Sequence, residues 1–352
     1  MDIKIKNLRI LLICFLFFSI TFYSAAFSDF ITDQVQNSNH AEIVVNGESH
    51  EENNFSVFVL PEEKISISIG KINGDFIKKG AAVCSWLIPR ESIIEEDENL
   101  DIKLIAPKTR GVYHVKLKIK YKDKEFLKKI SIIVLIPLED NKKINSYFFS
   151  LVNRIEKNRA SGYISASIRT GLNLTIPKSV WNNQSNYEAI PKGIIEVTKK
   201  DENTYISEHF KLKDFVCKGD AYPKLICLNY NLIRKLELLI DELESMGHKI
   251  NTIAIMSGFR TPWYNKKINV TRFSRHIYGD AADIYIDNDN NKRMDDLNKD
   301  RKINIKDAKY LAGIINEMDL KGIYPGGLHV YAGNKYRGPF VHVDTRGYII
   351  RW

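Results

Sequence analysis

The sequence is poor in several features that would place it in a specialised class of protein. Only four of its 352 residues are cysteines, which argues against a disulfide-dense scaffold. It has no internal repeat of solenoid length, which excludes a repeat architecture. No nucleic-acid-binding motif is visible and the lysines are spread along the chain, so nucleic acid is not an expected partner despite a formal charge of +9. That charge suits anionic envelope polymers or membrane surfaces, but a general bias of the composition toward lysine, isoleucine and asparagine is the explanation we favour.

The composition is nevertheless that of a folded protein. Hydrophobic residues make up 44% of the chain and charged residues 27%, which is ordinary for globular domains and excludes wholesale disorder. A chain of this length predicts two domains, each able to bury its own core.

One long hydrophobic run is present, and it lies at the N-terminus. Basic residues at Lys4, Lys6 and Arg9 precede the run 10–22, and the small residues 24–26 follow it. This is the plan of a secretory signal with cleavage after Ala26. If residues 1–28 are not cleaved, positions 8–27 can form one membrane-spanning anchor with a cytoplasmic N-terminus. We therefore expect an exported, periplasmic or cell-envelope protein whose only membrane contact is this segment.

Export permits disulfides, but few are possible here. Cys14 leaves with a cleaved signal, so Cys84, Cys217 and Cys227 remain. Cys217 and Cys227 are close enough in sequence to bridge a loop, and the odd number of thiols leaves the pairing open.

Residues 29–138 have the pattern of an all-β domain. Hydrophobic and polar residues alternate in 65–69, 115–121 and 130–134, with turn signals such as Asn73-Gly74 between the runs. Short strands at this spacing, with Trp86 available for the core, predict an immunoglobulin-like sandwich. No catalytic set is visible there, so we interpret the domain as a spacer or a binding module.

The remainder divides into a connector over 139–200 and an α+β unit over 201–352. A short helix is predicted over 147–159 from its apolar spacing. In the α+β unit we expect a helix over 228–247 that ends at Gly247, and a second helix over 306–318. The expected strands lie at 252–256, at 281–286, near Leu328 and near Phe340.

Two short stretches of the α+β unit carry candidate metal ligands. His276 and Asp283 are separated by a turn at Gly279, so the following strand can return the aspartate toward the histidine. His342 and Asp344 share one face of the last strand because side chains alternate. Two imidazoles and one carboxylate suit zinc, with the fourth position left to water as in catalytic sites. Asp344 is then placed to orient a neighbouring ligand.

Three ordered motifs add a family resemblance over roughly residues 193–352. The segments 257–260 (Ser-Gly-Phe-Arg), 274–283 (Ser-Arg-His-Ile-Tyr-Gly-Asp-Ala-Ala-Asp) and 340–344 (Phe-Val-His-Val-Asp) resemble the signatures of M15 peptidases. These are zinc D-Ala-D-Ala carboxypeptidases and murein endopeptidases with a hedgehog-like α+β fold, and the branch ending in Phe-Val-His-Val-Asp and Arg-Trp is the most similar. The resemblance implies zinc ligands at His276, Asp283 and His342. It also implies a substrate contact at Arg260, through a carboxylate or the developing oxyanion.

One position departs from the family pattern. Many members carry an acidic general base three residues before the last zinc histidine, where this chain has Pro339. Asp344 is one substitute, and His329 is another if its loop folds over the site. His329 is also an alternative third ligand, and as a solvated loop histidine it would be neither.

A polar insertion at about 287–307 predicts a second cation site. Counting from Asp296, oxygen donors fall at the positions of an EF-hand or dockerin-like calcium loop. These donors are Asp296, Asn298, Asp300, the Lys302 carbonyl, Asn304 and Asp307. Arg301 stands where such loops prefer glycine. An overlapping, less complete register uses Asp287, Asp289, Asn291, Asp295 and Asn298, and a loop without any ion is the remaining alternative.

The expected function is that of an exported zinc metallopeptidase that cuts D-amino-acid-containing stems or cross-links of peptidoglycan. The alternative is a cell-wall-binding or scaffolding protein that keeps the zinc fold without turnover.

Overall fold

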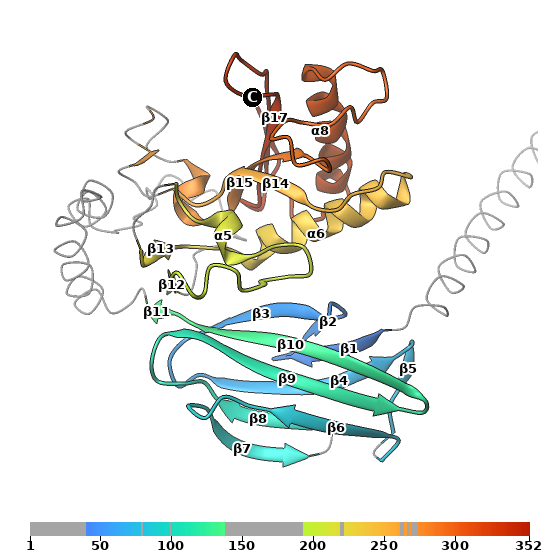
Figure 1. Cartoon of the computed structure of the whole chain (residues 1–352), viewed down its shortest axis with the longest axis vertical. Helices are drawn as coiled ribbons and strands as arrows, with labels where there is room; N and C mark the ends of the chain where they lie inside the picture. Colours follow the sequence, from blue (N-terminus) through green and yellow to red (C-terminus); the bar gives the residue numbers. More distant parts are fainter. Residues whose placement is uncertain are drawn as a thin grey trace, which may run out of the picture.

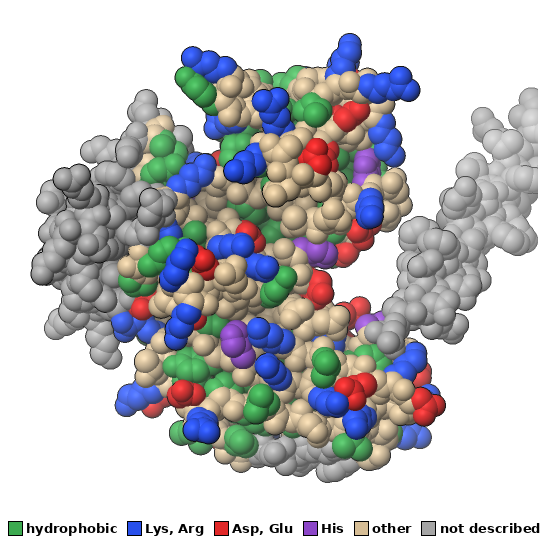
Figure 2. Space-filling view, viewed as in Figure 1, with side chains coloured by type: hydrophobic (Ala, Val, Ile, Leu, Met, Phe, Trp, Pro, Cys, Tyr) green, Lys and Arg blue, Asp and Glu red, His purple; other side chains and the backbone are tan. Residues whose placement is uncertain are grey.

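The computed structural model describes residues 40–78, 80–98, 100–137, 193–218, 222–260, 264–265, 268 and 274–352. The predicted signal or anchor (1–28) and the predicted helix at 147–159 lie outside these residues. Figure 1 shows a β-sandwich with the α+β unit stacked above it. In the same view, lysine and arginine side chains are spread over both parts of the visible face (Figure 2). Within the described residues, no helix is both long and apolar enough to cross a membrane.

The N-terminal domain consists of two sheets that enclose one hydrophobic core. Its strands are β1 (Ala41–Val45), β2 (Glu48–His50), β3 (Asn54–Val59), β4 (Lys64–Ile72), β5 (Asp75–Phe76), β6 (Ala82–Leu87), β7 (Ile93–Glu98), β8 (Asp101–Ile105), β9 (Gly111–Tyr121) and β10 (Lys124–Val134). One sheet has the order β2-β1-β4-β8-β7, with β5 beside β4, and the other has the order β3-β10-β9-β6. The strand runs β1-β4-β8-β7 and β6-β9-β10 are compatible with the two sheets of an immunoglobulin-like sandwich. Membership of the immunoglobulin-like class stays a prediction.

The alternating pattern explains the sandwich. In β4 the isoleucines at 65, 67 and 69 are buried, while the serine at 66 between them is exposed. Asn73 and Gly74 both adopt positive φ and turn the chain from β4 into β5, as the turn signal predicted. Each strand therefore contributes one face to the core.

The C-terminal unit is an α+β domain built on a five-stranded sheet. Its elements are β11 (Ile136–Pro137), β12 (Gly193–Val197), α5 (Leu212–Phe215), β13 (Lys224–Ile226), α6 (Tyr230–Ser245), β14 (Ile253–Ser257), the 3-10 helix η1 (Arg275–Tyr278), β15 (Ala281–Ile286), α8 (Ile305–Leu320), β16 (Gly327–Tyr331), β17 (Phe340–Asp344) and β18 (Ile350–Arg351). The main sheet has the order β14-β15-β17-β16-β18, and α8 packs on β16 and β17. The predicted strands and both predicted helices of this unit are present, with bounds shifted by a few residues.

Helix α6 forms for the reasons that its sequence indicated. The Asn229 side chain accepts a hydrogen bond from the Asn231 amide at the N-terminus, and Gly247 follows the C-terminus with a φ of 81°. Its leucine stripe is buried in the core of the C-terminal unit.

The connector expected over 139–200 is shorter at its C-terminal end. Residues 193–197 form β12, which pairs with β11 and β13 and contributes Ile194 and Ile195 to the C-terminal core. The run is too short for periodicity to separate a buried strand from a linker. The possible bridge is also absent, since the buried residues Cys217 and Cys227 are not joined by a disulfide.

The two domains contact each other through specific hydrogen bonds. The Tyr230 hydroxyl on α6 lies 3.0 Å from His50 Nδ1, and Arg234 donates to the Ser49 carbonyl at 2.8 Å. The His50 ring stacks on Phe55. Burial, followed by the charges of Arg234 and Lys128, lowers the pKa of His50 to about 4, so the imidazole is neutral at this interface.

Candidate metal centre and its pocket

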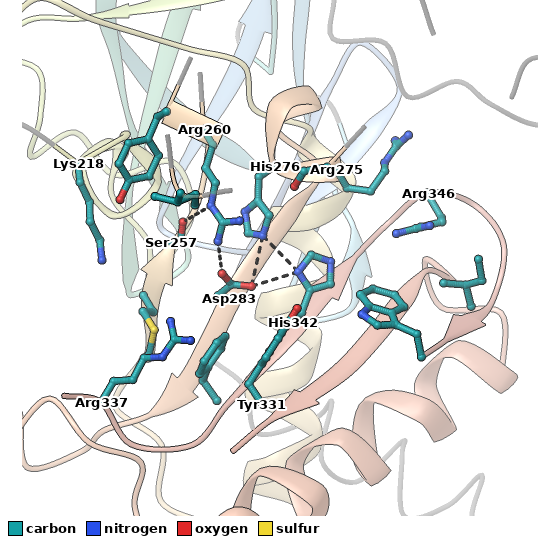
Figure 3. A pocket seen from close by; sticks show the side chains of 17 residues that line it. Lys218, Ser257, Arg260, Arg275, His276, Asp283, Tyr331, Arg337, His342 and Arg346 are labelled. Atoms are coloured by element: carbon teal, nitrogen blue, oxygen red, sulfur yellow. Dashed lines mark hydrogen bonds and ion pairs between the residues drawn. The ribbon is translucent and has the colours of Figure 1, made fainter. Parts of the chain in front are cut away.

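Three buried ligand atoms converge at one point of the C-terminal sheet. His276 Nε2 lies 3.2 Å from His342 Nδ1 and 3.2 Å from Asp283 Oδ1, and His342 Nδ1 lies 3.1 Å from the same oxygen. Tetrahedral zinc with bonds of about 2.0–2.1 Å requires ligand atoms about 3.3–3.4 Å apart. The observed triangle is close to that size, and Figure 3 shows the three side chains pointing toward one another.

The other nitrogens of both imidazoles are already occupied. His276 Nδ1 lies 2.7 Å from the Gly258 carbonyl oxygen, which only accepts, so this nitrogen carries the proton. His342 Nε2 lies 3.3 Å from Asp344 Oδ2, which assigns its proton in the same way. When each imidazole carries only this outer proton, two nitrogen lone pairs and a carboxylate oxygen point at the same position. Such a set of electron donors fits a divalent metal.

Sheet register and one tight turn bring the ligands together. Asp283 on β15 is directly opposite His342 on β17. His276 lies on η1, and Gly279 then turns the chain into β15 with a φ of 74°. A Cβ on Gly279 would lie 2.2 Å from the Cys227 carbonyl oxygen, so this turn tolerates no side chain. The glycine between the two ligands is thus a requirement of the site geometry.

Arg260 is bound to the metal-ligand cluster from the side of β14. Its guanidinium forms an ion pair with Asp283 Oδ2, and its Nε donates to Ser257 Oγ at 2.8 Å. Asp283 therefore directs one oxygen to the metal position and the other to Arg260. The guanidinium also lines the pocket, where the resemblance placed a substrate contact.

Asp344 lies behind His342, on the side away from the metal position. It is fully buried and accepts from the Gly327 amide at 2.7 Å and from Arg346 Nε at 2.9 Å, besides its contact with His342 Nε2. This arrangement favours orientation of His342 over a direct role as proton acceptor.

The electrostatics of the cluster follow from burial and mutual contact. Burial lowers the pKa of His276. Burial also lowers the pKa of His342, but its contacts with Asp283 and Asp344 outweigh this and raise the pKa to about 8. Burial raises the pKa of the Asp283 carboxyl, whereas the two histidines hold it well below its usual range. Asp283 is thus an anion, ready to bind a cation.

A pocket of about 740 Å³ opens in front of the three ligands, within the size range of small-molecule and peptide sites. Its wall combines cations with aromatic rings, and Asp283 is the only carboxylate among the described lining residues. The lining residues outside the metal cluster include Lys218, Tyr264, Tyr331, Arg337, Phe340, Arg346 and Trp352. Sequence reasoning missed Lys218, Tyr331 and Arg337, because they come from separate elements without a spacing signature.

The two proposed substitutes for the missing base do not line this pocket. Asp344 is behind His342, as described above. His329 lies on β16 opposite His342, stacks on Trp352 with ring centroids 5.3 Å apart, and contacts the Trp352 carbonyl oxygen. His329 is therefore packed against Trp352 and is not a member of the ligand triangle. Pro339, at the usual base position, has no proton acceptor in its side chain.

The insertion at 287–307 contains two similar turns. In the first, the Asn291 amide donates to Asp287 Oδ1 at 2.9 Å and Asp289 Oδ1 at 3.2 Å. Nine residues later, the Asp300 amide donates to Asp296 Oδ1 and Asn298 Oδ1 in the same way. Asp287, Asp289 and Asp295 bring carboxylate oxygens within 4.8 Å of one another, which favours the overlapping register as the better-assembled cation site.

The second turn differs from the first because its last acidic residue, Asp307, caps helix α8. Arg301 adopts a φ of 65°, so the turn forms without the glycine that calcium loops prefer. Both oxygens of Asp307 accept backbone amides, one from Asn298 and one from Asn304, and close the capping box of α8. Asp307 thus has a structural role that does not require an ion.

Comparison with known proteins supports the resemblance. Residues 208–309 match the family described as Peptidase M15. This segment contains the first two of the three motifs and two of the three candidate ligands. Over this segment the chain is therefore similar to M15 peptidases, a family of hydrolytic peptidases. No curated protein sequence matches the chain.

Three solved structures resemble part of the chain at low similarity. A chimeric titin Z1Z2 carrying a decorin peptide has 12% identity and a TM-score of 0.18, covering 28% of this chain and 97% of that one. Titin domain M7 has 9% identity and a TM-score of 0.18, covering 28% and 100%. Domains 4 and 5 of the S-layer protein SbsC have 11% identity and a TM-score of 0.16, covering 27% and 54%. At these TM-scores the likenesses carry no argument about fold class or function.

Proposed function

We propose that this protein is an exported zinc metallopeptidase that hydrolyses D-amino-acid-containing peptide stems or cross-links of peptidoglycan. The observation that carries the proposal is the triangle of His276 Nε2, Asp283 Oδ1 and His342 Nδ1, with edges of 3.1–3.2 Å, at the floor of an open pocket. Zinc in that position would polarise a scissile carbonyl and lower the pKa of a bound water.

The protein's own residues supply orientation and charge. Asp344 and Gly258 hold the two imidazoles in the tautomers that the cluster needs. Arg260 fixes Asp283, and its position in the pocket wall lets it donate to the oxygen that gains charge during peptide hydrolysis. The Tyr264 and Tyr331 hydroxyls are further lining groups able to donate hydrogen bonds to substrate.

A metal-binding and a digestion experiment test this proposal together. Purified protein should contain about one zinc per chain, and it should release peptides from isolated sacculi. His276→Ala should lose both properties. His114→Ala provides a control, because His114 is a half-buried sandwich residue that contacts Ser131 and no residue of the cluster. Zinc-loaded protein that leaves a broad panel of muropeptides intact would contradict the enzymatic function.

A second function is favoured by one observation. Among the described lining residues no carboxylate other than Asp283 is present, and Pro339 occupies the usual base position. A zinc-containing protein that binds cell wall without cleaving it has the same features. Co-sedimentation with sacculi, with no peptide released by the zinc-loaded protein, would identify this alternative.

We also propose that the insertion at 287–307 binds calcium and holds the hairpin between β16 and β17 beside the pocket. The backbone of Arg293 and Met294 lies within 4 Å of the position that a Cβ on Gly338 would take. Calcium should raise the midpoint of thermal unfolding, and Asp289→Asn should reduce that increase. An unchanged midpoint at millimolar calcium would refute this part.

A further inference from the structure

The pocket wall holds more positive charge than the metal cluster uses. Its described lining contains the cations Lys218, Arg260, Arg275, Arg337 and Arg346 against a single carboxylate. Three of them are already neutralised: Arg260 pairs with Asp283, Arg275 with Asp280, and Arg346 with Asp344. Lys218 and Arg337 have no ion-pair partner among the described residues. The stretch 245–279, which supplies much of this wall, contains no Asp or Glu.

Arg337 is held in place before any ligand arrives. It lies in the hairpin between β16 and β17, where its amide and carbonyl both pair with the backbone of Asn334. Its guanidinium carbon lies 4.6 Å from the centroid of the Phe340 ring, and Tyr331 stacks on the same phenylalanine. The cation–π contact uses the flat face of the guanidinium and leaves its N–H edge for hydrogen bonds.

The two unpaired cations lie on one side of the metal position. Figure 3 shows Lys218 and Arg337 on the side of the pocket where Ser257 and Arg260 lie, with Arg346 on the other side of His342. A planar guanidinium with a free edge matches a carboxylate in bidentate geometry, and an ammonium on the same side of the pocket supplies a further donor. The surrounding positive field also favours an anion over a neutral group.

We propose that Lys218 and Arg337 form a carboxylate subsite, and that the preferred substrate is a peptide with a free carboxylate close to the bond that is cut. The inference rests on the proposed peptidase function and adds a substrate class to it. A peptide whose carboxylate is converted to a carboxamide keeps its shape but loses the charge. The subsite therefore distinguishes acidic stems from amidated ones.

Matched peptide pairs test the subsite. Each pair consists of a D-alanine-containing stem peptide with a free carboxylate and the same peptide in which that carboxylate is a carboxamide. One pair is made for the C-terminal carboxylate and one for each side-chain carboxylate. For one of these positions the parent protein should favour the acid by about tenfold in kcat/KM and in binding affinity measured by calorimetry. Arg337→Gln should remove this preference, mainly through KM, and Lys218→Gln should reduce it.

Lys335→Gln is the matched control. Lys335 lies two residues from Arg337 in the same hairpin and sits over an aromatic ring, that of Tyr336 at 4.8 Å, but it does not line the pocket. This variant should keep the full preference for the acid. Equal affinity of the parent for acid and amide at every position would overturn the subsite, as would an equal loss in the Lys335 variant.

The two readouts separate this inference from the function on which it rests. Cleavage without any preference for the acid would refute the subsite and leave the peptidase function standing. Preferential binding of the acid, lost in Arg337→Gln, without cleavage by the zinc-loaded parent would support the subsite and refute the peptidase function.

Discussion

Replacing Asp344 by asparagine tests whether the buried carboxylate controls the metal centre. The substitution keeps the shape of the side chain but turns one acceptor oxygen into an NH2 donor. In the native protein this carboxylate faces His342 Nε2 at 3.3 Å and receives the Gly327 amide and Arg346. An NH2 group at that place would face an N–H group, so His342 would move its proton to Nδ1, the nitrogen that points at the metal position.

The expected size of the effect follows from the role of such outer partners. Loss of the residue that orients a metal-binding histidine typically costs about 10- to 100-fold in metal affinity, which corresponds to about 1.4–2.7 kcal/mol. Competition with a chromophoric zinc chelator at neutral pH measures this directly. Thermal unfolding of the metal-free protein should be recorded in parallel, because Arg346 loses its buried partner as well.

Asp307→Asn is the control for removing a buried carboxylate elsewhere. Asp307 is fully buried and accepts the amides of Asn298 and Asn304, and it contacts no residue of the ligand triangle. This variant should lower thermal stability and leave zinc affinity unchanged. If Asp344→Asn binds zinc as tightly as the parent, the orienting role is refuted.

Three further outcomes follow from the structure. Arg260→Lys should keep zinc bound but lower kcat for peptide hydrolysis by about 100-fold, because a lysine cannot hold Asp283 and donate to substrate at once; zinc content and steady-state kinetics measure this. Gly279→Ala should lower the free energy of unfolding, measured by chemical denaturation, by well over the roughly 1–2 kcal/mol that left-handed strain alone costs. Gly322→Ala is the control, because Gly322 is also at positive φ but has open space around it, and it should cost only that strain. The pKa of His50 falls from 6.5 to about 4 on folding. As pH decreases, this imidazole is therefore protonated in the unfolded chain before it is protonated in the folded protein. The stability from this residue is complete above pH 6.5 and declines by up to about 3 kcal/mol toward pH 4, and His50→Gln should flatten that part of the profile.

Much of the C-terminal unit could be predicted because its signals are local. The leucine stripe of α6, the apolar run of β15 and the alternation in β17 each define an element within a few residues. The candidate ligands His276, Asp283 and His342 could be named from their residue types and from the family resemblance, whereas their convergence depends on the pairing of β15 with β17. Strand β12 was not, because only its pairing with β11 and β13 distinguishes it from a linker.

Long-range packing explains the remaining differences. The Lys218 and Arg337 side chains line one pocket only because a loop after α5 and the β16–β17 hairpin both reach it. The sequence favoured the calcium register that begins at Asp296, because it counts donor types at fixed spacings. In the folded chain both oxygens of Asp307 accept backbone amides at the start of α8, whereas the carboxylates of Asp287, Asp289 and Asp295 converge. Spacing identifies possible donors, and the fold of the loop decides which of them come together.

The sandwich and the metal centre are joined through one helix. On α6, Tyr230 and Arg234 contact the sandwich residues His50 and Ser49. The next residue, Lys235, is 1% exposed, and its ammonium reaches the Asp344 carbonyl oxygen at 3.1 Å as well as Asp319. Because a buried ammonium needs all of these acceptors, the position of α6 and the backbone of Asp344 are mutually constrained. The sandwich therefore does more than extend the chain, since it packs against the helix that supports the strand on which His342 and Asp344 lie.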